Sequence, residues 1–190
     1  MTIQNKSERV CPWWMGYLLA SPIRRLFESP EKIVEPYIKP GMTVLEVGPG
    51  MGFFTIPMAR LVGENGKIIS VDLQDKMLKS LVRRAKRAGV DDRVIARLAT
   101  TDSLNIADFA GLVDSVILIA VVHEIPDQKN LFAQIYETMK PGALILIAEP
   151  AGHVTPESFK KMQGITKSQG LSEVSRPDIK RYISVVLKKM

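Results

Sequence analysis

The segment that most constrains the fold of this chain is residues 44–55, which read VLEVGPGMGFFT. Apolar residues lead into the segment, three glycines follow at alternate positions, and a helix-like pattern of apolar residues begins at Phe53. This order predicts a strand, a glycine turn and a helix. Because glycine has no Cβ, the turn can adopt positive φ angles or lie against a ligand, and the helix directs free N–H groups to the same space. The segment therefore predicts a site for a nucleotide-like molecule, although such turns also occur for packing reasons alone.

A second strand supports the ligand-binding interpretation. Residues 67–72 read KIISVD, a short apolar run that ends in the carboxylate of Asp72. An acidic residue at the tip of the second strand, about 20 residues after the glycine turn, can accept hydrogen bonds from ribose hydroxyls. The two segments together predict a site that binds a ribonucleoside.

The spacing of the glycines distinguishes between cofactor classes. A dinucleotide-binding turn requires G-x-G-x-x-G, but the sixth position here is Phe53 and the third glycine is Gly52, one residue too early. The turn instead resembles motif I of the class I S-adenosylmethionine-dependent methyltransferases, an acidic residue followed by x-G-x-G-x-G. Glu46, Gly48, Gly50 and Gly52 match that motif.

The remainder of the chain fits the same resemblance. Three further strands are predicted at residues 93–98, 116–122 and 143–148. The tail predicts two more strands, 171–176 and 181–188, and because the link between them is short they must be antiparallel. Class I methyltransferases end in such a hairpin, so the resemblance covers about residues 30–190. It implies an α/β fold: a Rossmann-like, doubly wound, mostly parallel seven-stranded sheet that ends in an antiparallel β-hairpin.

The N-terminal segment lies outside this resemblance. We expect residues 1–28 to form a helical extension and residues 29–190 to form the methyltransferase domain. The extension contains Trp13 and Trp14 and is interrupted at Ser21-Pro22. It could cover the sheet edge or core, act as a lid over the substrate, as N-terminal additions often do in this family, or dock at a membrane interface through its tryptophans.

The resemblance implies S-adenosylmethionine as cofactor and a set of residues that bind it. These residues are Glu46, Gly48, Pro49, Gly50, Gly52, Asp72, Leu73, Thr101, Asp102, Ala120 and Val121. The glycine turn would hold the methionine end, Glu46 would meet the ammonium group directly or through water, and Asp72 would accept both ribose hydroxyls. The backbone near Ala120 and Val121 would pass under the sulfonium.

The adenine would lie near two polar positions after the third strand. Leu73 would lie against the ring, and Asp102, which follows Thr101, would contact the adenine amino group. An N-cap for the short helix that follows is the competing role for Asp102.

The candidate catalytic residue is His123, just past the tip of the predicted central strand, where ligands bind in open α/β sheets. If the acceptor carries a proton, His123 is the best-placed base, because a histidine titrates near neutrality. It could equally serve only to hold its loop. His153, after the fifth strand, is a further candidate substrate contact. No N-P-P-Y or D-P-P-Y motif follows the fourth strand, which argues against methylation of DNA bases or glutamine and favours a small-molecule acceptor.

Composition limits the other possibilities. A single cysteine, Cys11, and two histidines give little basis for a metal site, and none is expected. The net charge of +6 could indicate an anionic partner such as RNA, but the densest basic run lies on a predicted helix. The exposed face of that helix would carry Lys76, Lys79, Arg83 and Arg87, and its apolar face would carry Leu78, Leu81, Val82 and Ala85. A solvated helix face is therefore the simpler interpretation.

These observations predict a cytoplasmic enzyme that transfers a methyl group to a small molecule. The apolar run at residues 11–20 is too short to span a bilayer and fits a signal peptide poorly, so we expect no stable membrane insertion. Three alternatives remain open: an RNA-directed methyltransferase, a nucleotide-binding protein without catalysis and, with less support, an NAD(P)-dependent oxidoreductase. The sequence does not determine the oligomeric state.

Overall fold

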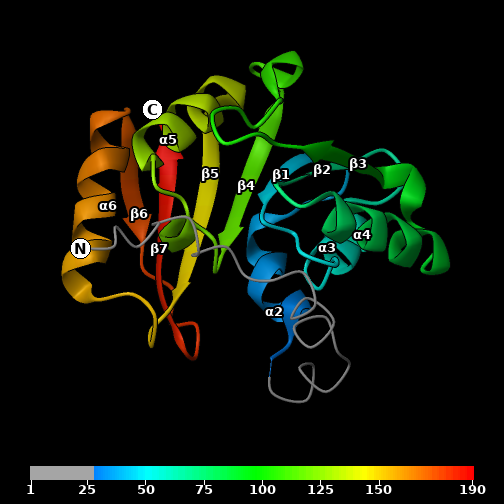
Figure 1. Cartoon of the computed structure of the whole chain (residues 1–190), viewed down its shortest axis with the longest axis horizontal. Coiled ribbons are helices and arrows are strands. Elements are labelled where there is room, and N and C mark those ends of the chain that lie inside the picture. Colours follow the sequence, from blue (N-terminus) through cyan, green and yellow to red (C-terminus); the bar gives the residue numbers. More distant parts are fainter. Residues whose placement is uncertain (1–27) are drawn as a thin grey trace, which may run out of the picture.

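The computed structural model describes residues 28–190, which form one seven-stranded sheet with helices on both faces (Figure 1). The strands are β1 (Thr43–Val47), β2 (Lys67–Asp72), β3 (Val94–Leu98), β4 (Val113–Ile119), β5 (Met139–Pro150), β6 (Leu171–Ser175) and β7 (Tyr182–Lys189). The α-helices are α2 (Pro30–Val34), α3 (Thr55–Val62), α4 (Asp75–Arg87), α5 (Gln128–Thr138) and α6 (Pro156–Ser168). Short 3-10 helices lie at Glu35–Tyr37, Asp91–Arg93, Ala107–Phe109 and Val122–Glu124. The predicted N-terminal extension, with Cys11, Trp13 and Trp14, lies outside the described residues.

The sheet has the strand order β3-β2-β1-β4-β5-β7-β6. Strands β1 to β5 are parallel, and β7 pairs antiparallel with both β5 and β6. This confirms the predicted doubly wound sheet and its antiparallel hairpin. The strand order reverses between β1 and β4, and in such sheets ligands bind at that point, beyond the carboxyl ends of the strands.

Two hydrophobic cores cover the two faces of the sheet. On one face, β1 residues such as Leu45 pack with residues of α5 and α6, including Phe132 and Phe159. On the other face, Val44 packs with residues of α2 and α3, including Met58. In Figure 1, α6 lies beside β6 and β7, while α4 lies at the β3 end of the sheet. Strands covered on both faces read as continuous apolar runs, and this explains why the sequence signal for β4 was strong.

Several predicted boundaries were wrong by a few residues. Helix α3 begins at Thr55 rather than Phe53, because residues 51–54 still belong to the turn. Strand β4 ends at Ile119 rather than at residue 122, because the chain turns sharply at Ala120, where φ is +55°. Strand β5 is longer than predicted and begins at Met139.

Helix α4 confirms the predicted solvated basic face, since Lys76, Lys79, Arg83 and Arg87 are all exposed. The prediction for its apolar face was wrong at one position. Val82 is 43% exposed, and Met77 is buried instead. No helix within residues 28–190 is long and apolar enough to cross a bilayer.

Candidate functional site

The glycine turn lies between the carboxyl end of β1 and the start of α3. Gly48, Gly50 and Gly52 have φ angles of +73°, +55° and +87°. Pro49 is buried, and its carbonyl accepts a 3.0 Å hydrogen bond from the Gly52 N–H, which closes the turn. A Cβ on Gly48 would lie 2.6 Å from Cγ2 of Val121, so the turn touches the loop after β4 and tolerates no side chain there. Two segments predicted to share the cofactor are therefore in direct contact.

Asp72 at the tip of β2 is joined to the glycine turn. Its Oδ2 accepts a hydrogen bond of 3.3 Å from the Gly50 N–H, and its Oδ1 accepts one of 2.8 Å from the Gln74 N–H. Burial raises the pKa of the Asp72 carboxyl, and these backbone donors partly oppose that rise. A Cβ built on Gly50 would meet no atom within 4 Å, so the turn is open to a ligand above this bond. Asp75 is the first residue of the following helix, α4, and forms an ion pair with Lys79.

Glu46 lies beneath the turn rather than in it. The residue is only 4% exposed, and its Oε2 accepts hydrogen bonds from the Thr55 hydroxyl at 2.6 Å and the Ser70 hydroxyl at 3.0 Å. Burial is the main cause that raises the pKa of Glu46 to about 7, and the nearby charge of Asp72 adds to it. The acidic residue of the motif therefore links β1 to β2 and to the start of α3.

The loop after β4 carries the candidate catalytic residue. The Ala120 N–H donates to the Ala148 carbonyl at 2.8 Å, which holds the tips of β4 and β5 together. A positive φ at a residue with a side chain costs roughly 1–2 kcal/mol, and it turns the chain away from the sheet. The 3-10 helix Val122–Glu124 follows, and His123 lies within it, its side chain 22% exposed.

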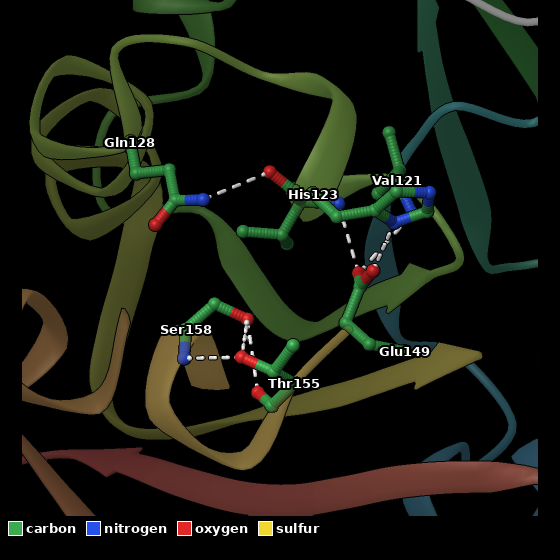
Figure 2. Close-up of polar contacts among 7 residues, drawn as sticks. Val121, His123, Gln128, Glu149, Thr155 and Ser158 are labelled. Carbon is green, nitrogen blue, oxygen red and sulfur yellow. Dashed lines mark hydrogen bonds and ion pairs between the residues drawn. The ribbon is translucent and has the colours of Figure 1, made fainter. Parts of the chain in front are cut away.

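Glu149, near the end of β5, holds this loop. Figure 2 shows its carboxylate facing the backbone of Val121 and the ring of His123. Oε1 accepts hydrogen bonds from the N–H groups of Val121 at 3.2 Å and Val122 at 2.9 Å, and Oε2 is bonded to Nδ1 of His123. Glu149 is only 2% exposed. The hydrogen bond to Glu149 is the main cause that raises the pKa of His123, while burial opposes it.

The second histidine lies against the first. The rings of His123 and His153 meet edge to face, with centroids 5.7 Å apart. His153 is exposed, in the loop between β5 and α6, and a Thr155 cap on the Ser158 N–H starts α6 directly after it (Figure 2). From the other side, the Gln128 amide donates to the Val122 carbonyl at 3.1 Å. Both histidines of the chain therefore lie together at the carboxyl ends of β4 and β5.

The predicted adenine residues lie in the turn after β3. The Thr100 N–H donates to the Ser103 carbonyl at 2.8 Å, which places Thr101 and Asp102 at the exposed tip of the turn. The alternative role of Asp102 as an N-cap is wrong, because Ile106 precedes the next short helix. The carbonyl of Asp102 accepts hydrogen bonds from two side-chain amides of α5, those of Asn130 at 2.9 Å and Gln134 at 3.2 Å.

The structure thus joins most of the predicted site residues but not all. Contacts link the glycine turn to Asp72 and Val121. Leu73 is 45% exposed, and within residues 28–190 no hydrogen bond or ion pair joins the Asp102 carboxylate to the turn. An open hollow of about 530 Å³ between α4 and β3 lies elsewhere, lined by Leu78, Val82 and other residues outside the predicted site. Sequence reasoning gave no role to Glu149, and its position directly after the predicted strand 143–148 is the one signal available for it.

Comparison with known proteins identifies the family. A family model described as a methyltransferase domain matches residues 38–180, most of the chain. The chain belongs to this family. This methyltransferase domain is 29% identical over 112 residues to a ubiquinone/menaquinone biosynthesis C-methyltransferase of Klebsiella pneumoniae, a match that covers 59% of the chain and 44% of that protein. The corresponding protein of a Marinomonas species is 27% identical over 135 residues, which cover 71% of the chain and 53% of the relative. The chain therefore spans about half the length of these curated relatives.

Solved structures confirm the fold of the methyltransferase domain. A methyltransferase of Aquifex aeolicus, described as dependent on S-adenosylmethionine, superposes with a TM-score of 0.85 at 22% identity, covering 95% of this chain and 100% of the other. A protein of Methanococcus maripaludis described as a putative S-adenosylmethionine-dependent methyltransferase has a TM-score of 0.77 at 16% identity, with 100% and 98% covered. The architecture is that of the class I S-adenosylmethionine-dependent methyltransferases, as the sequence predicted.

Proposed function

We propose that this methyltransferase domain binds S-adenosylmethionine across the glycine turn and Asp72, and methylates a small molecule held at the tips of β4 and β5. The hydrogen bond between the Gly50 N–H and Asp72 Oδ2 carries the cofactor assignment, because it brings the two halves of the predicted motif to one place. Family membership makes methyl transfer the reaction.

The residues present fit this cofactor. The turn is open above Gly50, where a bound molecule could approach the backbone within contact distance. Asp72 has two carboxylate oxygens, the number needed for two ribose hydroxyls, and both face backbone donors at the edge of the turn. Burial and the Asp72 charge disfavour ionisation of Glu46, so a cation nearby, such as the ammonium group of the cofactor, would favour its charged form. S-adenosylmethionine supplies a positively charged sulfonium that carries the methyl group.

The remaining predicted contacts belong to the same proposal. Gly48, Gly52 and Pro49 shape the turn for the methionine end, and Ala120 and Val121 form the floor beside it. Leu73, Thr101 and Asp102 are exposed at the tips of β2 and β3, where an adenine ring can cover them. The protein's main contribution is to orient donor and acceptor, which supplies much of the rate enhancement in a displacement reaction.

The small-molecule acceptor is supported by the relatives and by the site. The curated relatives are, by their names, C-methyltransferases of ubiquinone and menaquinone biosynthesis, but the chain covers only about half of them. We therefore carry over the class of acceptor, a small organic molecule, and not its identity. The acceptor would lie beside His123 and His153, the two rings at the tips of β4 and β5.

Calorimetric titration with S-adenosylmethionine tests the cofactor assignment. We expect wild-type protein to bind S-adenosylmethionine and its demethylated product, and not NADPH. D72A should weaken both affinities about tenfold or more, because a hydrogen bond to a charged group is worth roughly 1.5–3 kcal/mol. D91A, which removes an exposed carboxylate from the 3-10 helix Asp91–Arg93, is the matched control and should bind as wild type does. Equal affinity of D72A and D91A would refute the ribose assignment, and binding of NADPH alone would refute the cofactor.

A further inference from the structure

The contact between His123 and Glu149 determines which ring nitrogen of the histidine is available for chemistry. A carboxylate only accepts hydrogen bonds, so the Nδ1 atom that bonds to Glu149 Oε2 carries the proton. In a neutral imidazole the other nitrogen, Nε2, then presents its lone pair. No described residue forms a hydrogen bond with Nε2, and the side chain is partly open to solvent.

We propose that Glu149 is a positioning residue that keeps His123 in the Nδ1–H tautomer, so that Nε2 removes a proton from the acceptor. This inference rests on the proposed function and deepens it. It makes the acceptor a proton-bearing nucleophile, such as a phenolic or enolic hydroxyl, rather than a tertiary amine, thioether or pyridine-type nitrogen.

Two features of the geometry distinguish Glu149 from a surface ion pair. Its carboxylate is almost fully buried, and its other oxygen is held by the N–H groups of Val121 and Val122, so it cannot rotate away. Because those two residues directly precede His123, one carboxylate fixes both the backbone and the ring. A buried carboxylate that accepts from the Nδ1–H of a histidine is an arrangement that orients the ring for proton transfer.

The proposed step is balanced in protons and electrons. The acceptor's O–H proton moves to Nε2 as its oxygen forms a bond to the methyl carbon. The bonding pair of the carbon–sulfur bond stays on sulfur, and the imidazolium later releases the proton to water. Glu149 stabilises the imidazolium without taking its proton. The other titratable groups that face the ring are Glu124 of the same 3-10 helix and His153 across from it.

Substitution of Glu149 by glutamine separates this role from a merely structural one. The glutamine oxygen can still accept from the Val121 and Val122 N–H groups, so the loop keeps its support. Its NH₂ group must then donate to Nδ1 of His123, which moves the ring proton to Nε2. E149Q should therefore keep the fold and invert the tautomer. E124Q removes one neighbouring negative charge without touching the Nδ1 bond, and it is the charge-matched control.

Nitrogen-15 NMR of histidine-labelled protein reads the tautomer directly. The chain has two histidines, so H153Q leaves only the His123 ring and assigns it. We expect the Nδ1–H form in wild type and in E124Q at high pH, and the Nε2–H form in E149Q. An Nε2–H tautomer in wild type would overturn the inference without affecting the cofactor assignment.

Methylation assays give the functional half of the test. A panel of small phenols, enols and pyridines is incubated with S-adenosylmethionine and each variant, and S-adenosylmethionine affinity is measured in parallel. We expect turnover of hydroxyl acceptors only, with kcat lowered roughly 10²–10⁴-fold in E149Q at unchanged cofactor affinity. Methylation of pyridines alone, or wild-type rates in an E149Q whose tautomer is inverted, would overturn the proposal. If the wild-type protein did not bind S-adenosylmethionine, this would instead count against the proposed function.

Discussion

The buried carboxyl of Glu46 predicts an unusual dependence of stability on pH. Burial raises its pKa from the ordinary 4.5 to about 7, so between these values the folded state binds a proton that the unfolded state has released. Its contribution to the free energy of unfolding is therefore complete below about pH 4.5 and is lost as pH rises through 7. At roughly 1.4 kcal/mol per pKa unit, the loss is about 3 kcal/mol.

The E46Q variant isolates this contribution. Glutamine has the same shape, stays neutral at every pH, and can still accept from the Thr55 and Ser70 hydroxyls. Urea unfolding at pH 5, 6, 7 and 8 should show that wild type and E46Q are similar at pH 5. At pH 8, E46Q should be more stable than wild type by about 3 kcal/mol at most.

Comparison with E46Q removes the effect of other titrating groups, because His123 and Asp72 are present in both proteins. E137Q, which removes an exposed carboxylate on α5, controls for the change in net charge and should follow the wild-type curve. A constant difference between wild type and E46Q from pH 5 to pH 8 would show that Glu46 does not titrate in this range, and the reasoning from burial would fail.

Two further substitutions test the packing around the glycine turn and the conformational cost of a glycine within helix α6. G48A should weaken S-adenosylmethionine binding and lower the free energy of unfolding by at least about 1–2 kcal/mol, since its φ of +73° is unfavourable for a side chain and its Cβ meets Val121. Adding V121A should restore part of the loss in calorimetry and urea unfolding, and additive effects would exclude the contact. G164A in α6 has open space and no positive φ, so it should raise the free energy of unfolding by roughly 0.5–1 kcal/mol, and a loss in urea unfolding would contradict this.

Local chemistry made the overall architecture predictable from sequence. The glycines at 48, 50 and 52 can adopt the positive φ angles that the turn after β1 uses, and the short link between β6 and β7 permits only an antiparallel pair. The end of β4 could not be predicted in this way. Val121 and Val122 continue the apolar run, and only the positive φ of Ala120, a residue with no special preference for it, ends the strand.

The site was predictable where one motif supplied it and not where it depends on distant segments. Glu46 and Asp72 are marked by their positions relative to the glycines. The role of Glu149 depends on the pairing of β4 with β5, in which Ile119 lies opposite Ala148 and brings both strand tips to the same edge. That register is a tertiary property, so nothing in the local sequence indicated that Glu149, 26 residues from His123, contacts its ring.

The hydrogen bonds from two side-chain amides of α5 to the turn after β3 have a mechanical consequence. Strand β3 lies at the edge of the sheet and has one neighbouring strand, β2. Asn130 and Gln134 tie the backbone of the turn that contains Asp102 to the helix that follows the His123 loop. We therefore expect that binding of either ligand affects both the turn and the His123 loop, and that amide hydrogen exchange slows in both when either ligand binds.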